Sequence, residues 1–389
     1  MSATSTDNLV YLDHAATTPM RESAIAAMMP FLAGEYANPS GSHRFARRSR
    51  QAVDEARDMV AEVVGCSPGE IVFTGSGTEG DNMAIRGAVE RSGGRAVCSA
   101  AEHHAVLHCV EHVGGHVLGT DEWGAIDTEA LTRCLADAPE SGPDSIGVVS
   151  VMAVNNETGS VTDLEAVSRV VRRHAPRAVL HTDAVQAACW LDLRDVWPLV
   201  DAVALSAHKF GGPKGVGVLA IRAGSPIAPL ILGGGQERDR RSGTHNVAGI
   251  VATAVALADT DRDRGHESAR VASLRERLVS GVSQVGDVHR TIPADRSVPG
   301  VAHVCFPGVE NESLLYLLDE AGVCASAASA CASGAMEPSH VLAAMGVDRS
   351  LAHGALRLSL GHTTRESDVD AAISAVVSAV NHLRSATSR

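Results

Sequence analysis

The sequence predicts an α/β protein with a large domain, built on a mainly parallel β-sheet, and a smaller α+β domain. Short apolar runs, typical of buried strands, alternate with amphipathic stretches of helical period from about residue 45 to residue 260. The pattern becomes mixed after a charged stretch at 259–267. The 389 residues, 45% of them hydrophobic, are enough for two cores. We therefore expect a large domain over residues 16–260 and a small domain formed by residues 1–15 and 261–389.

The expected elements follow from the apolar pattern. In the large domain the strands are expected at 71–74, 96–99, 146–151, 178–182, 202–206 and 216–221, and the helices at 45–64, 78–91, 104–113, 162–174 and 247–259. The small domain is expected to hold strands near 301–306 and 355–360, a helix near 312–321 and a terminal helix. We interpret the charged stretch 259–267 as a linker or a helix start.

Composition argues against several function classes. The chain shows no run of 18 apolar residues and no signal-like start, so we expect a cytoplasmic protein without a membrane partner. The eight cysteines are scattered singly, which predicts neither a disulfide framework nor a metal site. A net charge of -13 argues against direct nucleic-acid binding, because such surfaces are usually basic.

The lysine content points to a specific chemistry. Of 33 lysine and arginine residues only two are lysine, Lys209 and Lys214. A chain this biased toward arginine is expected to keep lysine where a primary amine must lose its proton and attack a carbonyl, which arginine cannot do. We assign that chemistry to Lys209, and we interpret Lys214 as a packing residue of a glycine-rich turn.

Polar clusters follow five of the expected strands: GSGTE, AEHH, NNETG, DAVQ and SAHK. Ligands of open parallel sheets lie beyond the carboxyl ends of the strands, so these clusters are expected to face one crevice. GSGTE is a glycine-rich turn entering a helix, which suits a phosphate group.

The residues alone leave several roles open. Asp183 either pairs with a protonated ring nitrogen or caps a helix, and Gln186 either reaches a ring hydroxyl or completes a capping box. His103 either stacks on a ring or is a bystander, and Ser206 and His208 hold either a phosphate or the lysine.

Ten segments, taken in order from about residue 10 to residue 364, resemble the signature blocks of the NifS/IscS cysteine desulfurases. That family belongs to the class V aminotransferase group of fold type I pyridoxal-phosphate enzymes, and the resemblance implies their seven-stranded sheet. The segments are YLDHAATTP, ANPSGSH, FTGSGTEGDN, AEHHAVLH, VNNETG, HTDAVQ, SAHKFGGPKGVG, GGGQERDRRSGT, SACASGAMEPSHVL and LRLSLGHTT.

The resemblance implies pyridoxal 5'-phosphate as the cofactor. It assigns the Schiff base to Lys209, the pyridine nitrogen to Asp183, the ring oxygen to Gln186 and ring stacking to His103. Thr244 is expected to reach the phosphate from the other subunit, which implies a homodimer with shared active sites. The full set of implied cofactor residues is Gly77, Thr78, His103, Asn156, Asp183, Gln186, Ser206, His208, Lys209 and Thr244.

The resemblance also implies the substrate and the route of its sulfur. Asn156 and Arg357 are expected to bind the α-carboxylate of L-cysteine, with Asn38 at the same mouth. Cys331, in an alanine-rich stretch, is expected to take the sulfur as a persulfide and pass it to an acceptor protein. The implied catalytic residues are Lys209, His103 and Cys331.

Three alternatives stay open: a selenocysteine lyase, a cysteine lyase without a persulfide, and a non-catalytic scaffold that binds metal or partner proteins. The chain stops at HLRSATSR, without the docking tail of family members that feed iron-sulfur scaffolds. The acceptor is therefore expected to belong either to cluster assembly or to a dedicated thio-modification pathway.

Overall fold

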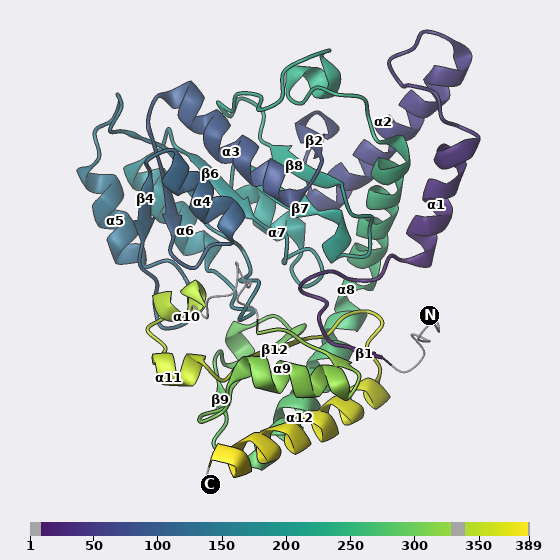
Figure 1. Ribbon diagram of the computed structural model, residues 1–389. Helices are drawn as coiled ribbons and strands as arrows, with labels where there is room; N and C mark the ends of the chain where they lie inside the picture. The colour runs from purple at the N-terminus through teal and green to yellow at the C-terminus, as the bar shows by residue number, and fades with distance from the viewer. Residues whose placement is uncertain (1–8, 328–338, 388–389) are drawn as a thin grey trace.

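The computed structural model describes residues 9–327 and 339–387. Figure 1 shows two units, a large one around an extended sheet and a smaller one packed below it. Cys331 lies outside the described residues, so the prediction made for it is not tested by the structure.

The large unit contains the expected mainly parallel sheet. Its seven strands follow the order β2-β8-β7-β6-β5-β3-β4, and only β8 runs antiparallel to its neighbours. Six of the strands lie where the apolar runs predicted them, and β4 was missed because its side chains are largely exposed. The strands are β2 (Ile71–Thr74), β3 (Arg95–Ser99), β4 (His116–Leu118), β5 (Ile146–Ser150), β6 (Val179–Asp183), β7 (Ala202–Ser206) and β8 (Gly217–Ile221).

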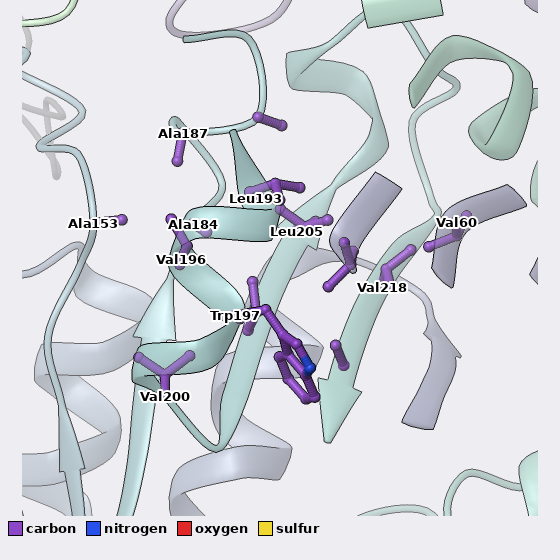
Figure 2. Packing of buried hydrophobic residues seen from close by; sticks show 14 of the residues in the cluster. Val60, Ala153, Ala184, Ala187, Leu193, Val196, Trp197, Val200, Leu205 and Val218 are labelled. Atoms are coloured by element: carbon purple, nitrogen blue, oxygen red, sulfur yellow. The ribbon is translucent and has the colours of Figure 1, made fainter. Parts of the chain in front are cut away.

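Helices cover both faces of this sheet, because successive strand residues point to opposite sides. Val72 packs with α3 and α4 on one face, whereas its neighbours Ile71 and Phe73 pack with α2, α5 and α6 on the other. Figure 2 shows part of the second core, where Trp197 lies near Leu205 and Val218. The helices of this unit are α1 (Glu22–Ala33), α2 (Arg44–Val64), α3 (Gly77–Ser92), α4 (His104–His112), α5 (Thr128–Asp137), α6 (Leu164–His174) and α7 (Leu193–Val196).

One long helix, α8 (Val247–Val282), corrects the interpretation of the charged stretch 259–267, which is neither a linker nor a helix start. The first part of α8 packs in the large core through residues such as Leu257, and the last part packs in the small core through residues such as Leu278. The charged stretch lies between these two contacts, and ion pairs three residues apart add support along it, as between Arg262 and Asp259. The expected boundary between the two domains, at residue 260, stays a prediction, and it falls inside the continuous helix α8.

The small unit has an antiparallel sheet in the order β12-β10-β9 and a two-stranded parallel pair, β1 with β11. The pair joins residues near the start of the chain to this unit. Leu12 lies in the same core as α8, α9 and α12. The elements are β1 (Val10–Tyr11), β9 (His289–Arg290), β10 (Val301–Cys305), α9 (Asn311–Glu320), β11 (Val323–Cys324), α10 (His340–Ala344), α11 (Arg349–Ala352), β12 (Ala355–Ser359) and α12 (Glu366–Thr387).

No helix among the described residues is both long enough and apolar enough to cross a membrane.

Candidate active site

A cavity of about 330 Å³ opens where the parallel strands end and the small unit begins. Its position agrees with the rule that ligands of open α/β sheets lie beyond the carboxyl ends of the strands. Ten of the residues singled out in the sequence line it: Gly77, Thr78, His103, Asn156, Asp183, Gln186, Ser206, His208, Lys209 and Arg357.

Lys209 follows β7 in a short turn, and backbone carbonyls hold its amine. Its Nζ donates to the carbonyl oxygens of Ala15 at 2.5 Å and Ala16 at 2.9 Å. Burial lowers the pKa of Lys209 to about 8; the charge of Arg357 also lowers it, and that of Asp183 opposes the shift. At this pKa about a tenth of the amine is neutral at pH 7, and this neutral form is the nucleophile.

Asp183 ends β6 with its carboxyl group buried in the cavity. Burial raises its pKa to about 6, against the hydrogen bond from the backbone N–H of Val185 and the charge of Lys209. Its Oδ1 accepts that N–H at 2.9 Å within a turn, and the next helix, α7, begins only at Leu193, so the helix-capping alternative is wrong. A buried carboxyl group with a raised pKa is stabilised in its ionised form when a cation binds beside it.

The start of α3 forms a close-packed turn. A Cβ atom on Gly77 would lie 2.7 Å from Cγ2 of Val185 and 3.2 Å from Cβ of Ser206, so the backbone approach requires glycine. Ser76 caps the helix by accepting the N–H of Glu79 at 3.1 Å. The free amides of a helix N-terminus, with hydroxyl groups beside them, suit a phosphate.

His208 and His103 are both held as neutral imidazoles. Burial, followed by the charges of Lys209 and Lys214, lowers the pKa of His208 to about 4. Its Nδ1 lies 3.1 Å from Oγ1 of Thr17. Burial, then Lys209, also lowers the pKa of His103, whose Nδ1 accepts the N–H of Ala105 at 3.1 Å. With Nδ1 accepting, the neutral ring carries its hydrogen on Nε2, which can donate.

Gln186 completes this side of the cavity. Its Nε2 donates to the carbonyl oxygen of Ala15 at 2.8 Å, the same oxygen that accepts from Lys209. The structure therefore places the Gln186 amide beside the lysine, where it lines the cavity.

Arg357 reaches the cavity from β12 of the small unit. Its Nη1 donates to the carbonyl oxygen of Asn156 at 2.8 Å, and its Nη2 donates to Oδ1 of Asp13 at 2.8 Å. Neither Nε of Arg357 nor Oδ1 of Asn156, both buried, has a hydrogen-bond partner among the described residues. The unpaired Nε–H of Arg357, on a fixed guanidinium, suits a carboxylate, whereas the unpaired Oδ1 of Asn156 suits a donor such as an amine.

Two predicted residues lie outside this cavity. Asn38 is exposed and accepts the N–H of Ser40 at 3.0 Å. Thr244 is also exposed, in the loop between β8 and α8. Neither residue therefore reaches the cavity of this chain.

Other residues of the cavity were not assigned a role from the sequence. Ala15 and Ala16 contribute through backbone carbonyls, which no side-chain pattern reveals. Asp81 of α3 lines the cavity fully buried, and burial, with the charges of Asp183 and Glu102, raises its pKa well above the usual value. Asp81 lies within the FTGSGTEGDN block, and its acidic side chain in an otherwise apolar helix face was the available signal.

These groups fit pyridoxal 5'-phosphate. The close-packed glycine turn accepts a phosphate, the buried Asp183 carboxyl suits a protonated ring nitrogen, and Lys209 supplies a reactive amine. Within residues 9–327 and 339–387, no group of three or more His, Cys, Asp or Glu side chains is arranged to hold a metal ion.

Comparison with known proteins identifies the family and the relatives to which this chain is similar. Residues 10–372 match the family Aminotransferase class-V. The chain is 42% identical to an "IscS-like cysteine desulfurase" of Mycobacterium tuberculosis, over 97% of this chain and 98% of that protein. Among solved structures it is similar to a "NIFS-LIKE PROTEIN", with a TM-score of 0.88, 35% identity and coverage of 96% and 100%. It is also similar to "SspA in complex with cysteine", with a TM-score of 0.76, 31% identity and coverage of 90% and 98%.

Proposed function

Because this chain belongs to the class-V aminotransferase family, we propose that it is a cysteine desulfurase that takes the sulfur of L-cysteine onto Cys331. One observation carries the proposal: Lys209, Asp183 and Arg357, which come from distant parts of the sequence, line one cavity. Relatives named cysteine desulfurase, and a solved relative in complex with cysteine, support the choice of substrate.

Pyridoxal 5'-phosphate, when bound, supplies an aldehyde carbon that joins an amine and a ring that draws electrons from the adjacent carbon. We assign its phosphate to the start of α3, with Thr78, Ser206 and His208 as further donors. Asp183 would keep the ring nitrogen protonated, Gln186 would hold the ring oxygen and His103 would pack against the ring.

Lys209 has two tasks in this proposal. Its neutral amine would hold the cofactor, and the same amine, when free, would take the proton from the substrate Cα. A pKa of about 8 suits both tasks, because the amine exchanges its proton near neutral pH. His103, which lines the cavity, would carry the proton of the substrate thiol.

Arg357 and Asn156 hold the substrate carboxylate. Asp13 and the Asn156 carbonyl fix the guanidinium, so it loses little conformational freedom when the substrate binds. This contact also requires the small unit to stay closed on the large one, because Arg357 lies in β12.

Sulfur transfer balances without an outside oxidant. The Cys331 thiolate attacks the substrate sulfur, the bond between that sulfur and Cβ breaks, and a sulfur–sulfur bond forms. The carbon fragment takes up protons and leaves as L-alanine, and the enzyme keeps a persulfide. An acceptor protein then removes the outer sulfur, and we propose that this takes place in the cytoplasm.

The homodimer is part of the proposal. Helix α1 and the residues after it present an exposed apolar stripe of Ile25, Met29, Leu32 and Tyr36, with exposed fractions from 44% to 73%. Leu232, in the loop that carries Thr244, is 79% exposed. Apolar surface of this kind favours burial against a second copy, which would also bring Thr244 to the partner's cofactor site.

The test compares two cysteine variants. Cys331→Ala should keep the coloured cofactor and lose persulfide formation from L-cysteine. Cys324→Ala is the matched control: this thiol lies seven residues earlier in β11, and burial, with Asp319 and Asp13, raises its pKa. Persulfide formation at the normal rate by the Cys331 variant would refute the nucleophile assignment.

A further inference from the structure

The loop of residues 231–246, which connects the β8 side of the sheet to α8, has an unfavourable backbone. Glu237, Arg238 and Asp239 have φ values of 50°, 57° and 63°, in the left-handed region. Side chains with a Cβ atom disfavour this region, and three such residues in a row are uncommon. Contacts elsewhere must therefore hold the loop in this shape.

The Glu237 carboxylate supplies those contacts. It is 5% exposed and accepts from Arg57 of α2, with Nη2 to Oε1 at 2.6 Å and Nη1 to Oε2 at 2.8 Å. It also accepts the backbone N–H of Phe73 in β2 at 2.9 Å. The left-handed run is thus fastened to a helix and to an edge strand of the sheet.

The same carboxylate fixes the end of the loop next to Thr244. Oε1 of Glu237 lies 2.8 Å from Nε2 of His245, and that histidine directly follows Thr244. Burial acts to raise the pKa of Glu237, but the hydrogen bonds from His245 and Arg57 outweigh it and lower the pKa to about 2. The carboxylate is therefore ionised at neutral pH, when charge-assisted hydrogen bonds are strongest.

A second ion pair connects the loop to the start of α3 in the same chain, the turn to which we assign the phosphate. Arg241 donates to Glu79 through Nε to Oε1 at 2.8 Å and through Nη2 to Oε2 at 3.2 Å. Oε2 of Glu79 also accepts the N–H of Gly75 at 2.8 Å, just before α3. The carboxylates of Glu237 and Glu79 thus fix the position of the loop relative to α2, β2 and the start of α3.

We propose that Glu237, acting through Arg57 and His245, is a positioning residue that presents Thr244 to the cofactor site of the partner subunit. The inference rests on the proposed homodimer with shared sites. Glu237 does not line the cavity of its own subunit, and Thr244 is exposed there, so the effect of this cluster falls on the other site.

Mixed dimers with a single Lys209 separate an effect on the partner's site from an effect within one subunit. In the first arrangement a wild-type subunit is paired with a Lys209→Ala/Glu237→Gln subunit. Only the wild-type subunit has Lys209, and the Thr244 loop that reaches its site comes from the subunit with Glu237→Gln. In the second, a Glu237→Gln subunit is paired with a Lys209→Ala subunit. The readouts are the visible absorbance of the Lys209-linked cofactor during dialysis and the fraction trapped on Lys209 by borohydride.

The first arrangement should release the cofactor roughly tenfold faster than wild type paired with Lys209→Ala, as expected when a charge-assisted contact is lost. The second should release it at the reference rate. Glu276→Gln is the matched control: Glu276 also accepts two bonds from one arginine, Arg290, at 2.9 Å each, but in the small unit. It should leave release unchanged in both arrangements.

Faster release only in the second arrangement, or in neither, would overturn the inference. Thr244→Ala in the same two arrangements identifies which proposal has failed. If it has no effect across the subunits, the shared site itself is refuted; if it accelerates release there and Glu237→Gln does not, only the positioning role is refuted. If Glu237→Gln does not fold, His245→Ala removes one of the carboxylate's donors and should give a smaller acceleration in the first arrangement alone.

Discussion

Gly77→Ala should loosen cofactor binding while leaving the fold intact. The added methyl group would lie 2.7 Å from Cγ2 of Val185 and 3.2 Å from Cβ of Ser206, both closer than ordinary carbon contacts. Either α3 moves away from β7 or Val185 moves, and Val185 donates its N–H to Asp183. Each movement displaces a group that we assign to the cofactor.

Overpacking of this kind costs about 1–3 kcal/mol. The clash displaces the turn, and binding must return the turn to its wild-type position. If this step carries the cost, the dissociation constant of the cofactor rises by about 5- to 150-fold. Release during dialysis, followed by visible absorbance, measures it, and thermal unfolding of the cofactor-free protein shows whether the fold is affected.

Gly80→Ala, one turn further along α3, is the control. Its added Cβ would meet Cβ of Ala204 at 3.4 Å, an ordinary contact, so cofactor affinity should stay near wild type. If Gly77→Ala binds the cofactor within about twofold of wild type, the close-packed phosphate turn is not what the site requires.

Three further outcomes are expected. Asp183→Asn in the cofactor-free protein removes a charge that raises the pKa of Lys209, so this pKa should fall below about 8. The pH dependence of Lys209 acylation measures it, because mass spectrometry distinguishes the two lysines of the chain. An unchanged pKa would contradict the interaction between Asp183 and Lys209. Gly265 lies in the middle of α8 with open space around it, so Gly265→Ala should raise the free energy of unfolding by about 0.5–1 kcal/mol in chemical unfolding. An unchanged free energy of unfolding would indicate that this stretch is a linker and not a helix. Arg357→Lys loses the planar guanidinium and should raise KM for L-cysteine about tenfold with a smaller change in kcat; an unchanged KM would remove Arg357 from the substrate site.

Local pattern was sufficient for much of the fold. The strand that ends at Ser206 is apolar from Ala202 to Leu205 because both of its faces are covered by helices. The shortage of lysine marked Lys209 before any neighbour was known. Strand ends of one parallel sheet must meet at one edge, so convergence of the polar clusters was predictable.

The remaining features depend on long-range contacts. The stretch 259–267 is polar enough to suggest a linker, but it is helical because α8 packs into a different core at each end. The carbonyl groups of Ala15 and Ala16 hold Lys209 with backbone atoms from almost 200 residues away. Glu237 meets Arg57 across 180 residues, which no local spacing predicts.

The account depends most on the assignment of the cofactor link to Lys209. Reduction of the purified protein with borohydride, followed by peptide mapping, tests it directly. We predict a single reduced pyridoxyl adduct on Lys209 and none on Lys214, with loss of L-alanine formation. An adduct on Lys214, or no adduct in a protein that still forms L-alanine, would contradict the account.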